Sequence, residues 1–428
     1  MASSSIIVRP LETQEEIEQQ FIWSDQAFSR QPPDPDRARE WSRSFLMQPD
    51  FHPRQLRGAF RDGIQLGGYA IYEWTLRMGA ARIPAGCIGI VVVNPDARKQ
   101  GAASALMHDA IQFAREQRHS LLLLDGIPKF YYRYGYTDVF DVTTYDIDRG
   151  AILAHPGSSH TVRQATPEDA QAVRDLYERR LGSYTGSFER SVEKQEYLLR
   201  NRFSRNTILL ALSFSGTAEG YLIASREPSA AHGVEIAADN WQAQIALMQA
   251  HVHLTDGPDA PEKHTYYLAP NSPELYNVID HLEVLDTSKW QNPAEEWGVR
   301  TSQFHHRYAG WMGRFVHLPT LLAAMLPELE VRWRRALAQW SGELHFVIGD
   351  EGVTLRIEGT KLSLVDSPSS EAIIFQSSPQ SFAQLVFGYR PVSWILEQHP
   401  QQLSDEARSV LSLLFPVSHS CLSFSDWF

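Results

Sequence analysis

The sequence predicts an α/β (α+β) chain of three successive segments, and two patterns lead to this prediction. Between residues 86 and 126 a strand-like run, "GCIGIVVVN", precedes an amphipathic helix and a second buried run, "SLLLLDG". This order is a crossover unit, which places two parallel strands in a mixed sheet flanked by helices. Near the end of the chain, "ELHFVI", "VTLRIEG" and "KLSLVD" alternate with period two, which is typical of an antiparallel sheet with one face in water.

The first segment, residues 1–155, contains the crossover unit. It opens with a helix-like stretch, "TQEEIEQQFIWSDQAF", followed by a proline-rich loop and β-rich runs with turns at Asp62-Gly63 and Gly79. After Gly101, apolar residues return at three- and four-residue spacing, as on one buried face of a helix. These residues are Ala103, Leu106, Met107, Ala110, Ile111 and Ala114.

The second segment, residues 156–304, repeats the order of the first: strand, acidic helix start, amphipathic helix, hairpin, helix and strand. Its turn before the later helix, "VEIAADNWQ", has neither a basic residue nor a glycine, so we expect a degenerate duplicate kept for structure. The third segment, residues 305–428, holds the antiparallel strands and a capped helix, "SPQSFAQLVFG".

Length, charge and cysteine content restrict the class of protein. The 428 residues give room for about three domains. A net charge of −12 argues against nucleic acid as a main partner, and it suits either a cationic substrate or solubility alone. No apolar run approaches the roughly 20 residues of a membrane span, and the start does not resemble a signal peptide. Cys87 and Cys421 are too few for a disulfide framework, so we expect free thiols in the cytoplasm.

The turn "RKQGAA", residues 98–103, has the features of an anion site. Its small residues permit close approach of a ligand to the backbone, and the helix that follows leaves its first N–H groups unpaired. Arg98 and Lys99 supply positive charge. Such turns also arise by chance, but here the turn follows a buried strand and "FYYRYGY" follows the next one, so aromatic residues are expected to flank the same cleft.

Together, "VVVNPDARKQGAASALM" and "FYYRYGY" resemble the core of the GNAT family of acetyl-CoA-dependent N-acyltransferases. That family's turn, Arg/Gln-x-x-Gly-x-Gly/Ala, is matched by Arg98, Gly101 and Ala103, and its later motif by Tyr131, Gly135 and Tyr136. The whole chain resembles the Eis (enhanced intracellular survival) type of acetyltransferase. The resemblance implies a catalytic GNAT domain at 1–155, a degenerate one at 156–304 and a sterol-carrier-protein-like domain at 305–428 that ends in the active-site C-terminus.

This resemblance also implies how acetyl-CoA binds. Its pantetheine arm would pair with the strand before the turn, its pyrophosphate would lie on the turn, and the end of the next strand would complete the site. The implied residues are Val91, Val92, Val93, Arg98, Lys99, Gln100, Gly101, Ala102, Ala103, Ser104, Gly126 and Ile127. Gln100 stands where the family often has a cation, which predicts weaker cofactor binding. The family further implies a homo-oligomer, a hexamer.

Acyl transfer from a thioester to an amine needs a proton donor for the leaving thiolate and a group that handles the ammonium proton. By resemblance Tyr131 is the general acid, while Tyr132 and Tyr134 are expected to be packing residues. The resemblance also implies that the C-terminal carboxylate of Phe428 is the base or an anchor for the ammonium. With a pKa of about 3.5 it is some six to seven units too weak for direct deprotonation, so it needs burial, a water relay or a later, more acidic proton. A tail packed only for stability is the alternative.

Asp25, Trp23 and Asp426 are the candidate substrate-binding residues, because carboxylates and rings suit a polyamine or an aminoglycoside. Either carboxylate can equally be a surface charge. His251 with His253, and His305 with His306, lack further ligands at suitable spacing, so we expect no metal.

Three functions remain open at this stage. The first is N-acetylation by acetyl-CoA of cationic amines, either small molecules or lysine side chains. The second is acyl transfer to a protein N-terminus, or transfer of a longer acyl chain. The third is binding of CoA or lipid without catalysis, against which the intact Tyr131 and turn residues count. The natural amine and the acetylated nitrogen do not follow from the sequence.

Overall fold

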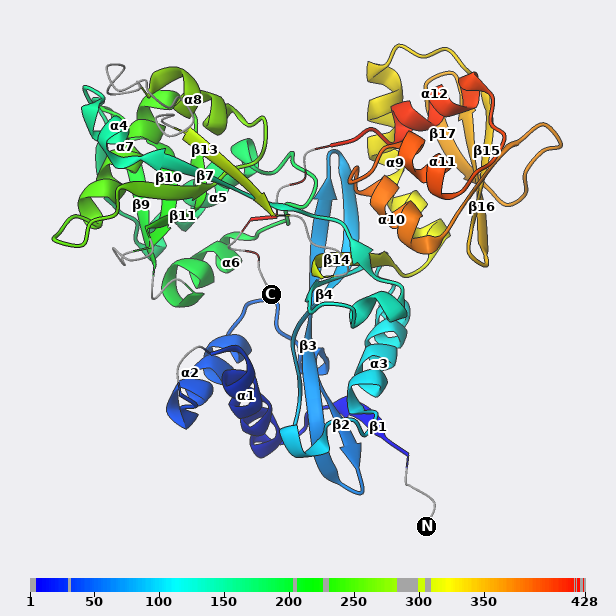
Figure 1. Cartoon of the computed structure of the whole chain (residues 1–428), viewed down its shortest axis with the longest axis horizontal. Helices are drawn as coiled ribbons and strands as arrows, with labels where there is room; N and C mark the ends of the chain where they lie inside the picture. The colour runs from blue at the N-terminus through cyan, green and yellow to red at the C-terminus, as the bar shows by residue number, and fades with distance from the viewer. Residues whose placement is uncertain are drawn as a thin grey trace, which may run out of the picture. The chain divides into compact units, whose positions relative to one another are not determined.

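The computed structural model describes residues 5–29, 32–202, 206–225, 231–282, 299–304, 309–418, 420, 422–423 and 426. These residues form three sheets and separate into two compact units, which are described one at a time (Figure 1). The first unit combines the chain up to Phe140 with residues 306–418, and the second combines residues 141–305 with residues 419–427. The predicted α/β fold class is confirmed.

The first sheet contains seven strands and carries the predicted crossover. In spatial order these are β1 (Ile7–Pro10), β2 (Leu56–Arg61), β3 (Ile64–Met78), β4 (Ala81–Val93), β5 (Leu121–Gly126), β14 (Gly310–Phe315) and β6 (Thr137–Asp138). Strands β4 and β5 are parallel and are joined by helix α3 (Ala102–Glu116), as the sequence predicts. The other neighbours in this sheet run antiparallel.

Helices cover both faces of the first sheet (Figure 1). On one face lie α1 (Gln14–Phe28), which starts with a capping box between Thr13 and Glu16, and α2 (Pro35–Leu46). On the other face lies α3, which buries Leu106, Met107, Ala110, Phe113 and Ala114 against the sheet. Alternate residues of β3 pack into the two cores, as strand geometry requires. In the predicted apolar face of α3, Ala103 and Ile111 are half-buried.

The second unit repeats this plan. Its sheet has the order β13 (Val299–Phe304), β7 (Val142–Asp148), β12 (Lys263–Tyr267), β11 (His232–Ala238), β10 (Ala218–Ser225), β9 (Asn206–Leu212) and β8 (Thr161–Gln164). Strands β11 and β12 are parallel and are joined by α7 (Trp241–Leu254). The remaining helices are α4 (Arg149–Ala154), α5 (Ala170–Arg180), α6 (Val192–Tyr197) and α8 (Pro273–His281).

Two strands, β7 and β14, pair in a sheet outside the predicted domain that contains them. The predicted first domain ends at residue 155, but β7 pairs with β12 and β13 in the second sheet. The predicted third domain starts at residue 305, but β14 pairs with β5 and β6 in the first sheet. Residues 419–427, here called the C-terminal segment, belong to the second unit, and residues 420, 422, 423 and 426 of this segment are described. Strand pairing between distant segments decides these assignments, and the local pattern of a strand does not contain that information.

The third sheet lies in the first unit and has the order β17 (Lys361–Val365), β16 (Glu351–Glu358), β15 (Gly342–Ile348) and β18 (Ile373–Ser377). The three predicted antiparallel strands are β15, β16 and β17, and β18 adds a parallel edge to β15. Four helices accompany it: α9 (Leu318–Arg335), α10 (Pro379–Val386), α11 (Val392–Gln398) and α12 (Asp405–Leu414). Within the described residues, no helix is long and apolar enough to cross a membrane.

Candidate active site

Strands β4 and β5 separate after a short parallel stretch. Their pairing extends only from Ala85–Leu121 to Ile88–Leu124. Just beyond it, Tyr69 of β3 faces two residues of β4, Ile90 and Val91, since the register changes between the pairs Gly68–Val92 and Ala70–Gly89. A bulge of this kind bends the strand that contains it. Among the described residues, no strand pairs with Val91–Val93 on the side of β5, so this edge of β4 is available to a ligand.

A buried glutamine of α1 holds the bulge. Gln20 Nε2 donates a hydrogen bond of 3.0 Å to the carbonyl oxygen of Ile90, whose φ is +44°. Gln20 is not predictable from the sequence, because a glutamine on a helix carries no signal for a contact with a strand 70 residues away. By fixing the Ile90 carbonyl, Gln20 fixes the point at which β4 leaves β5.

The turn after β4 presents unpaired backbone N–H groups. It contains a short 3₁₀ turn, Pro95–Ala97, and then Lys99 and Gly101, both with positive φ. Gly101, at φ +92°, is the N-cap of α3, and none of the described side chains caps the helix. None of the described residues accepts a hydrogen bond from the backbone N–H groups of residues 100–104. These donors and the positive end of the helix dipole form a site suited to a phosphate group.

A cation stands beside Gln100, although Gln100 itself is neutral. Arg61, on β2, donates from Nη1 to Gln100 Oε1 and from Nη2 to the Gln100 carbonyl oxygen, each at 2.9 Å. Arg61 on β2 therefore supplies a positive charge beside the position where the turn has the neutral Gln100. The local sequence of the turn does not indicate Arg61, because 39 residues separate Arg61 from Gln100.

Tyr131 lies at the end of β5, on a short 3₁₀ helix, Tyr131–Tyr134. A Cβ atom placed on Gly126 would come within 3.1 Å of Tyr131 Cδ2, so the absence of a side chain at Gly126 allows the ring to lie against the strand end. The ring also meets Phe130 edge-on, with centroids 4.9 Å apart. Ile127, the next residue after Gly126, is exposed. Tyr131 and the separation of β4 and β5 thus lie at the same end of β5.

Burial is the main cause that raises the pKa of Tyr131, to about 12, and the negative charge of Asp125 and the neighbouring Tyr134 add to it. The phenol therefore stays protonated at neutral pH. Full transfer of its proton to a thiolate with a pKa near 8.5 is uphill by about 5 kcal/mol at about 1.4 kcal/mol per unit. Tyr131 is thus suited to donate a hydrogen bond to a forming thiolate and to release the proton only as that charge develops.

The two other tyrosines of the motif differ from each other. The Tyr134 hydroxyl forms a hydrogen bond of 2.9 Å with the Ser104 hydroxyl and so connects the 3₁₀ helix to the first turn of α3. Tyr132 is 39% exposed. Tyr134 is therefore a buried packing residue that also forms a hydrogen bond, whereas Tyr132 contributes little to the core.

The carboxylate of Asp25 is already paired. Arg37 donates to it from Nε and Nη2, at 2.6 and 2.7 Å, and the Asp34 backbone N–H donates at 3.0 Å. The hydrogen bond from Arg37 is the main cause that lowers the pKa of Asp25. Asp25 and Trp23 are both buried in α1. In this structure Asp25 fixes the connection to α2, and its role toward a substrate stays a prediction.

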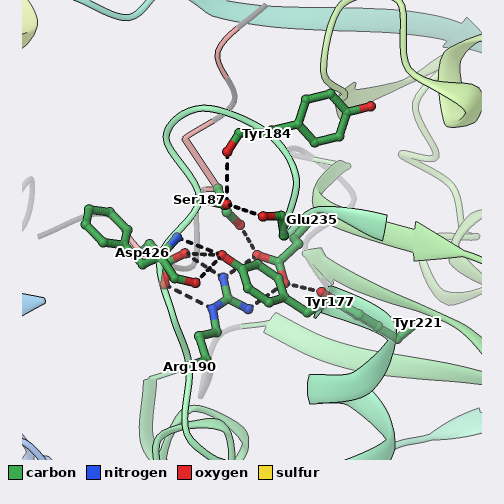
Figure 2. A network of polar contacts seen from close by, with 10 residues as sticks. Tyr177, Tyr184, Ser187, Arg190, Tyr221, Glu235 and Asp426 are labelled. Atoms are coloured by element: carbon green, nitrogen blue, oxygen red, sulfur yellow. Dashed lines mark hydrogen bonds and ion pairs between the residues drawn. The ribbon is translucent and has the colours of Figure 1, made fainter. Parts of the chain in front are cut away.

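Asp426 is paired in the same way, within the second unit (Figure 2). Arg190 donates to it from Nε and Nη2, at 3.1 and 2.8 Å, and neither side chain is exposed. Phe428, the predicted base, lies outside the described residues, as do Cys421, His305 and His306. His251 is buried, and burial lowers its pKa to about 3. Among the described residues, no three histidine, cysteine or acidic side chains are grouped as metal ligands.

Residues 8–139 match a family model described as an acetyltransferase (GNAT) domain. These residues contain the open edge of β4, the uncapped turn and Tyr131, so the match and the geometry agree. Residues 8–139 therefore form a GNAT acetyltransferase domain. No curated protein matches the sequence.

Among solved structures, the chain shares the fold of Eis1 from Mycobacterium abscessus, at a TM-score of 0.65 and 15% identity over 99% of this chain and 100% of that one. A GCN5-related N-acetyltransferase from Kribbella flavida has a TM-score of 0.71 at 17% identity, covering 100% and 99%. A probable N-acyltransferase of unknown function from Enterococcus faecalis V583 has the same TM-score and identity, covering 97% and 98%. The full-length architecture of two GNAT-like sheets and a third C-terminal sheet is thus Eis-like.

Proposed function

We propose that the chain transfers the acetyl group of acetyl-CoA to an amino group of a cationic small molecule, such as a polyamine or an aminoglycoside. The observation that carries the proposal is the combination, in one domain, of the open edge of β4, the uncapped turn at Gly101 and Tyr131 at the end of β5. The GNAT family implies the acyl-CoA, and the choice of acetyl and of the amine is ours.

In this proposal the cofactor lies along residues that the fold leaves unsatisfied. The pantetheine amides pair with the free edge of Val91–Val93. The pyrophosphate accepts hydrogen bonds from the N–H groups of the turn, and Arg98, Lys99 and Arg61 offset its charge. Gly126 and Ile127 flank the thioester end of the pantetheine arm.

The reaction forms a C–N bond between the amine and the acetyl carbon and breaks the C–S bond of the thioester. The ammonium first loses one proton to solvent, the same nitrogen loses a second proton after the C–N bond has formed, and the leaving thiolate gains one. Tyr131 donates to the sulfur, and its raised pKa ensures that it holds the proton before the reaction begins. After the reaction the Tyr131 oxygen regains a proton from solvent.

We propose the carboxylate of Phe428 as the base or as the anchor of the ammonium. A carboxylate is a weak base, so its most favourable task is to accept the acidic proton present after C–N bond formation, or to relay it through water. A tail that serves only stability is the competing explanation, and removal of Phe428 distinguishes the two.

The substrate site needs negative charge, and the two predicted carboxylates already have arginine partners. An amine would therefore compete with Arg37 at Asp25 and with Arg190 at Asp426. Asp125 is exposed at the end of β5, and its charge acts on Tyr131. We propose Asp125 as a further carboxylate that attracts the amine. As in the Eis type, we also propose a homo-oligomer, a hexamer, in the cytoplasm.

The test is release of CoA from acetyl-CoA with a panel of polyamines and aminoglycosides, with intact protein and with Tyr131→Phe. We expect kcat to fall by about 100-fold, which is within the usual effect of a general acid, with little change in the KM of acetyl-CoA. Tyr132→Phe is the matched control, because Tyr132 is the exposed neighbour. Full activity of Tyr131→Phe would remove Tyr131 from the mechanism, and no turnover of any amine by intact protein would contradict the proposed substrate class.

A further inference from the structure

The second unit uses a buried arginine to hold a residue from the end of the chain (Figure 2). Arg190 lies between α5 and α6, and one edge of its guanidinium donates to Asp426. Nη1 and Nη2 donate to Glu235, at 3.0 and 2.9 Å. Each carboxylate is thus bound in a two-pronged manner by a different edge, which the ammonium of a lysine cannot reproduce.

The groups around this arginine are closely matched to it. Arg190 Cζ lies 3.7 Å from the ring centroid of Tyr177, whose hydroxyl donates toward the Phe188 carbonyl and Asp426, at 2.9 and 3.3 Å. Tyr221 donates to Glu235 at 2.5 Å. Burying ions costs several kcal/mol each unless their polar atoms are paired, so a cluster this deeply buried depends on these contacts.

The C-terminal segment contributes three described residues to this cluster or its surroundings. Besides Asp426, Ser423 donates a hydrogen bond to Glu235, and Ser420 forms a parallel bridge with Thr185. Without the segment, Arg190 and Glu235 still form a neutral pair. The segment therefore adds a second carboxylate to an ion pair that the rest of the second unit forms by itself.

Glu235 occupies the position in the second sheet that corresponds to the separation of β4 and β5 in the first sheet. Glu235 is two residues past Gly233, the last residue of β11 that pairs with β12. In the first domain, Ile90 is likewise two residues past Ile88, the last residue of β4 that pairs with β5. Both strands have a bulge at this point. In the first sheet this position, Ile90, lies where β4 separates from β5. In the second sheet the corresponding position, Glu235, binds the C-terminal segment.

We propose that the second domain is a dock for the C-terminal segment and that Asp426 is a positioning residue for the Phe428 carboxylate. The catalytic part of this inference rests on the proposed function, whereas the docking part does not. Phe428 follows Asp426 by two residues, so the chain keeps their Cα atoms within about 7 Å of each other. A fixed Asp426 thus restricts the space that the terminal carboxylate can reach.

The experiment compares full-length protein with Asp426→Ala, which removes the anchor and leaves Arg190 paired with Glu235. Carboxypeptidase A is added to the native proteins, and release of the last residues is followed by mass spectrometry. We expect at least tenfold faster release from Asp426→Ala. We also expect at least a tenfold loss in kcat with an unchanged KM for acetyl-CoA, and little further loss when Phe428 is deleted from this variant. Asp366→Ala, an exposed carboxylate in the first unit, is the control.

Each outcome decides a separate statement. Equal release from both proteins would overturn the dock. Faster release with full kcat would overturn the positioning role while the dock stands. Full activity after deletion of Phe428 from otherwise intact protein would overturn the proposed base, and the release assay would still decide the dock. If Asp426→Ala does not fold, Ser423→Ala is the milder variant, and it should shift release in the same direction by a smaller factor.

Discussion

In the first unit, Gly101 is the N-cap of α3 and none of the described side chains caps this helix, whereas in the second unit the N-cap of α7 is Asn240, whose side chain accepts a hydrogen bond of 2.8 Å from the Ala243 N–H. Both helices join parallel strands, and both follow a bulged strand. The donors that would bind an anion are open in α3 and partly satisfied in α7. The cap is thus one difference between the two helix starts, and the missing glycine and cations in the turn before α7 are others.

Other parts of the two halves are alike. Each begins with an arginine on its first strand that forms two hydrogen bonds to an acid in the first turn of the helix region: Arg9 with Glu16, and Arg163 with Asp169. In each half the acid also completes a capping box with a threonine. Because these pairs recur where only one half has an open turn, they belong to the framework and not to the site.

The largest effect should come from closing the open turn. Gly101→Ala places a Cβ at φ +92°, at a cost of roughly 1–2 kcal/mol, and disturbs N–H donors whose bonds to a charged group are worth about 1.5–3 kcal/mol each. We expect acetyl-CoA to bind about 10- to 100-fold more weakly, as measured by calorimetric titration.

Gly216→Ala is the matched control for this change. Gly216 has a φ of +82° at a hairpin end in the second unit, and a Cβ there meets nothing within 4 Å. Both substitutions place a Cβ on a residue with positive φ, so the free energy of unfolding should fall by a similar amount in the two variants. The affinity for acetyl-CoA should be unchanged in Gly216→Ala. Equal affinity losses in the two variants would show that the turn at Gly101 is not where the cofactor binds.

The two pairs, Arg9 with Glu16 and Arg163 with Asp169, allow a test of whether the two halves of the molecule are stabilised in the same way. The hydrogen bond from Arg9 is the main cause that lowers the pKa of Glu16 to about 2, and Arg163 does the same for Asp169. Shifts of about two units correspond to about 3 kcal/mol, which we halve to about 1–2 kcal/mol because Arg9 and Arg163 are 33% and 43% exposed.

Since these carboxyl pKa values are lowered in the folded state, the stabilisation is present above about pH 4.5 and is lost as the pH falls toward 2. Glu16→Gln should therefore speed hydrogen exchange in α1 at pH 7, and Asp169→Asn should do so in α5, each leaving the other helix unchanged. The difference from the unsubstituted protein should shrink as the pH is lowered. Faster exchange in both helices from either variant would contradict two independent framework pairs.

The sequence predicts the features that depend on neighbouring residues. The spacing of α3, the crossover of β4 and β5 and the small-residue turn all follow from local patterns, and the structure confirms these elements. The contacts that complete the picture are distant in sequence: Gln20 to Ile90 spans 70 residues, and Arg190 to Asp426 spans 236. The same holds for β7 and β14, whose sheets are chosen by pairing with remote strands. No local periodicity encodes such partners.

A smaller effect on acetyl-CoA binding is expected from a substitution of Arg61, which lies beside the turn of the first half. The turn of the second half, "VEIAADNWQ", has no basic residue. Arg61→Gln removes the positive charge beside Gln100, and a partly exposed charge contributes up to about 1 kcal/mol. We expect the KM of acetyl-CoA to rise about three- to fivefold, with a smaller difference at high salt because ions screen the interaction. Arg39→Gln, an exposed arginine on α2, should leave KM unchanged. A rise in the KM of acetyl-CoA for Arg61→Gln that is the same at low and high salt would indicate a structural effect and not a loss of charge.

The smallest effect on function should come from Asn240→Ala, which removes the cap of α7 and its hydrogen bond to Glu219. Loss of an N-cap costs about 1 kcal/mol, so hydrogen exchange in the first turns of α7 should become faster. Opening these N–H groups does not create an anion site, because the turn "VEIAADNWQ" lacks the cations and the glycine of its counterpart. Acetyl-CoA should therefore still bind with one equivalent per chain and the same KM. A second equivalent in Asn240→Ala would mean that the cap alone had closed the second half, and that the missing cations were of no consequence.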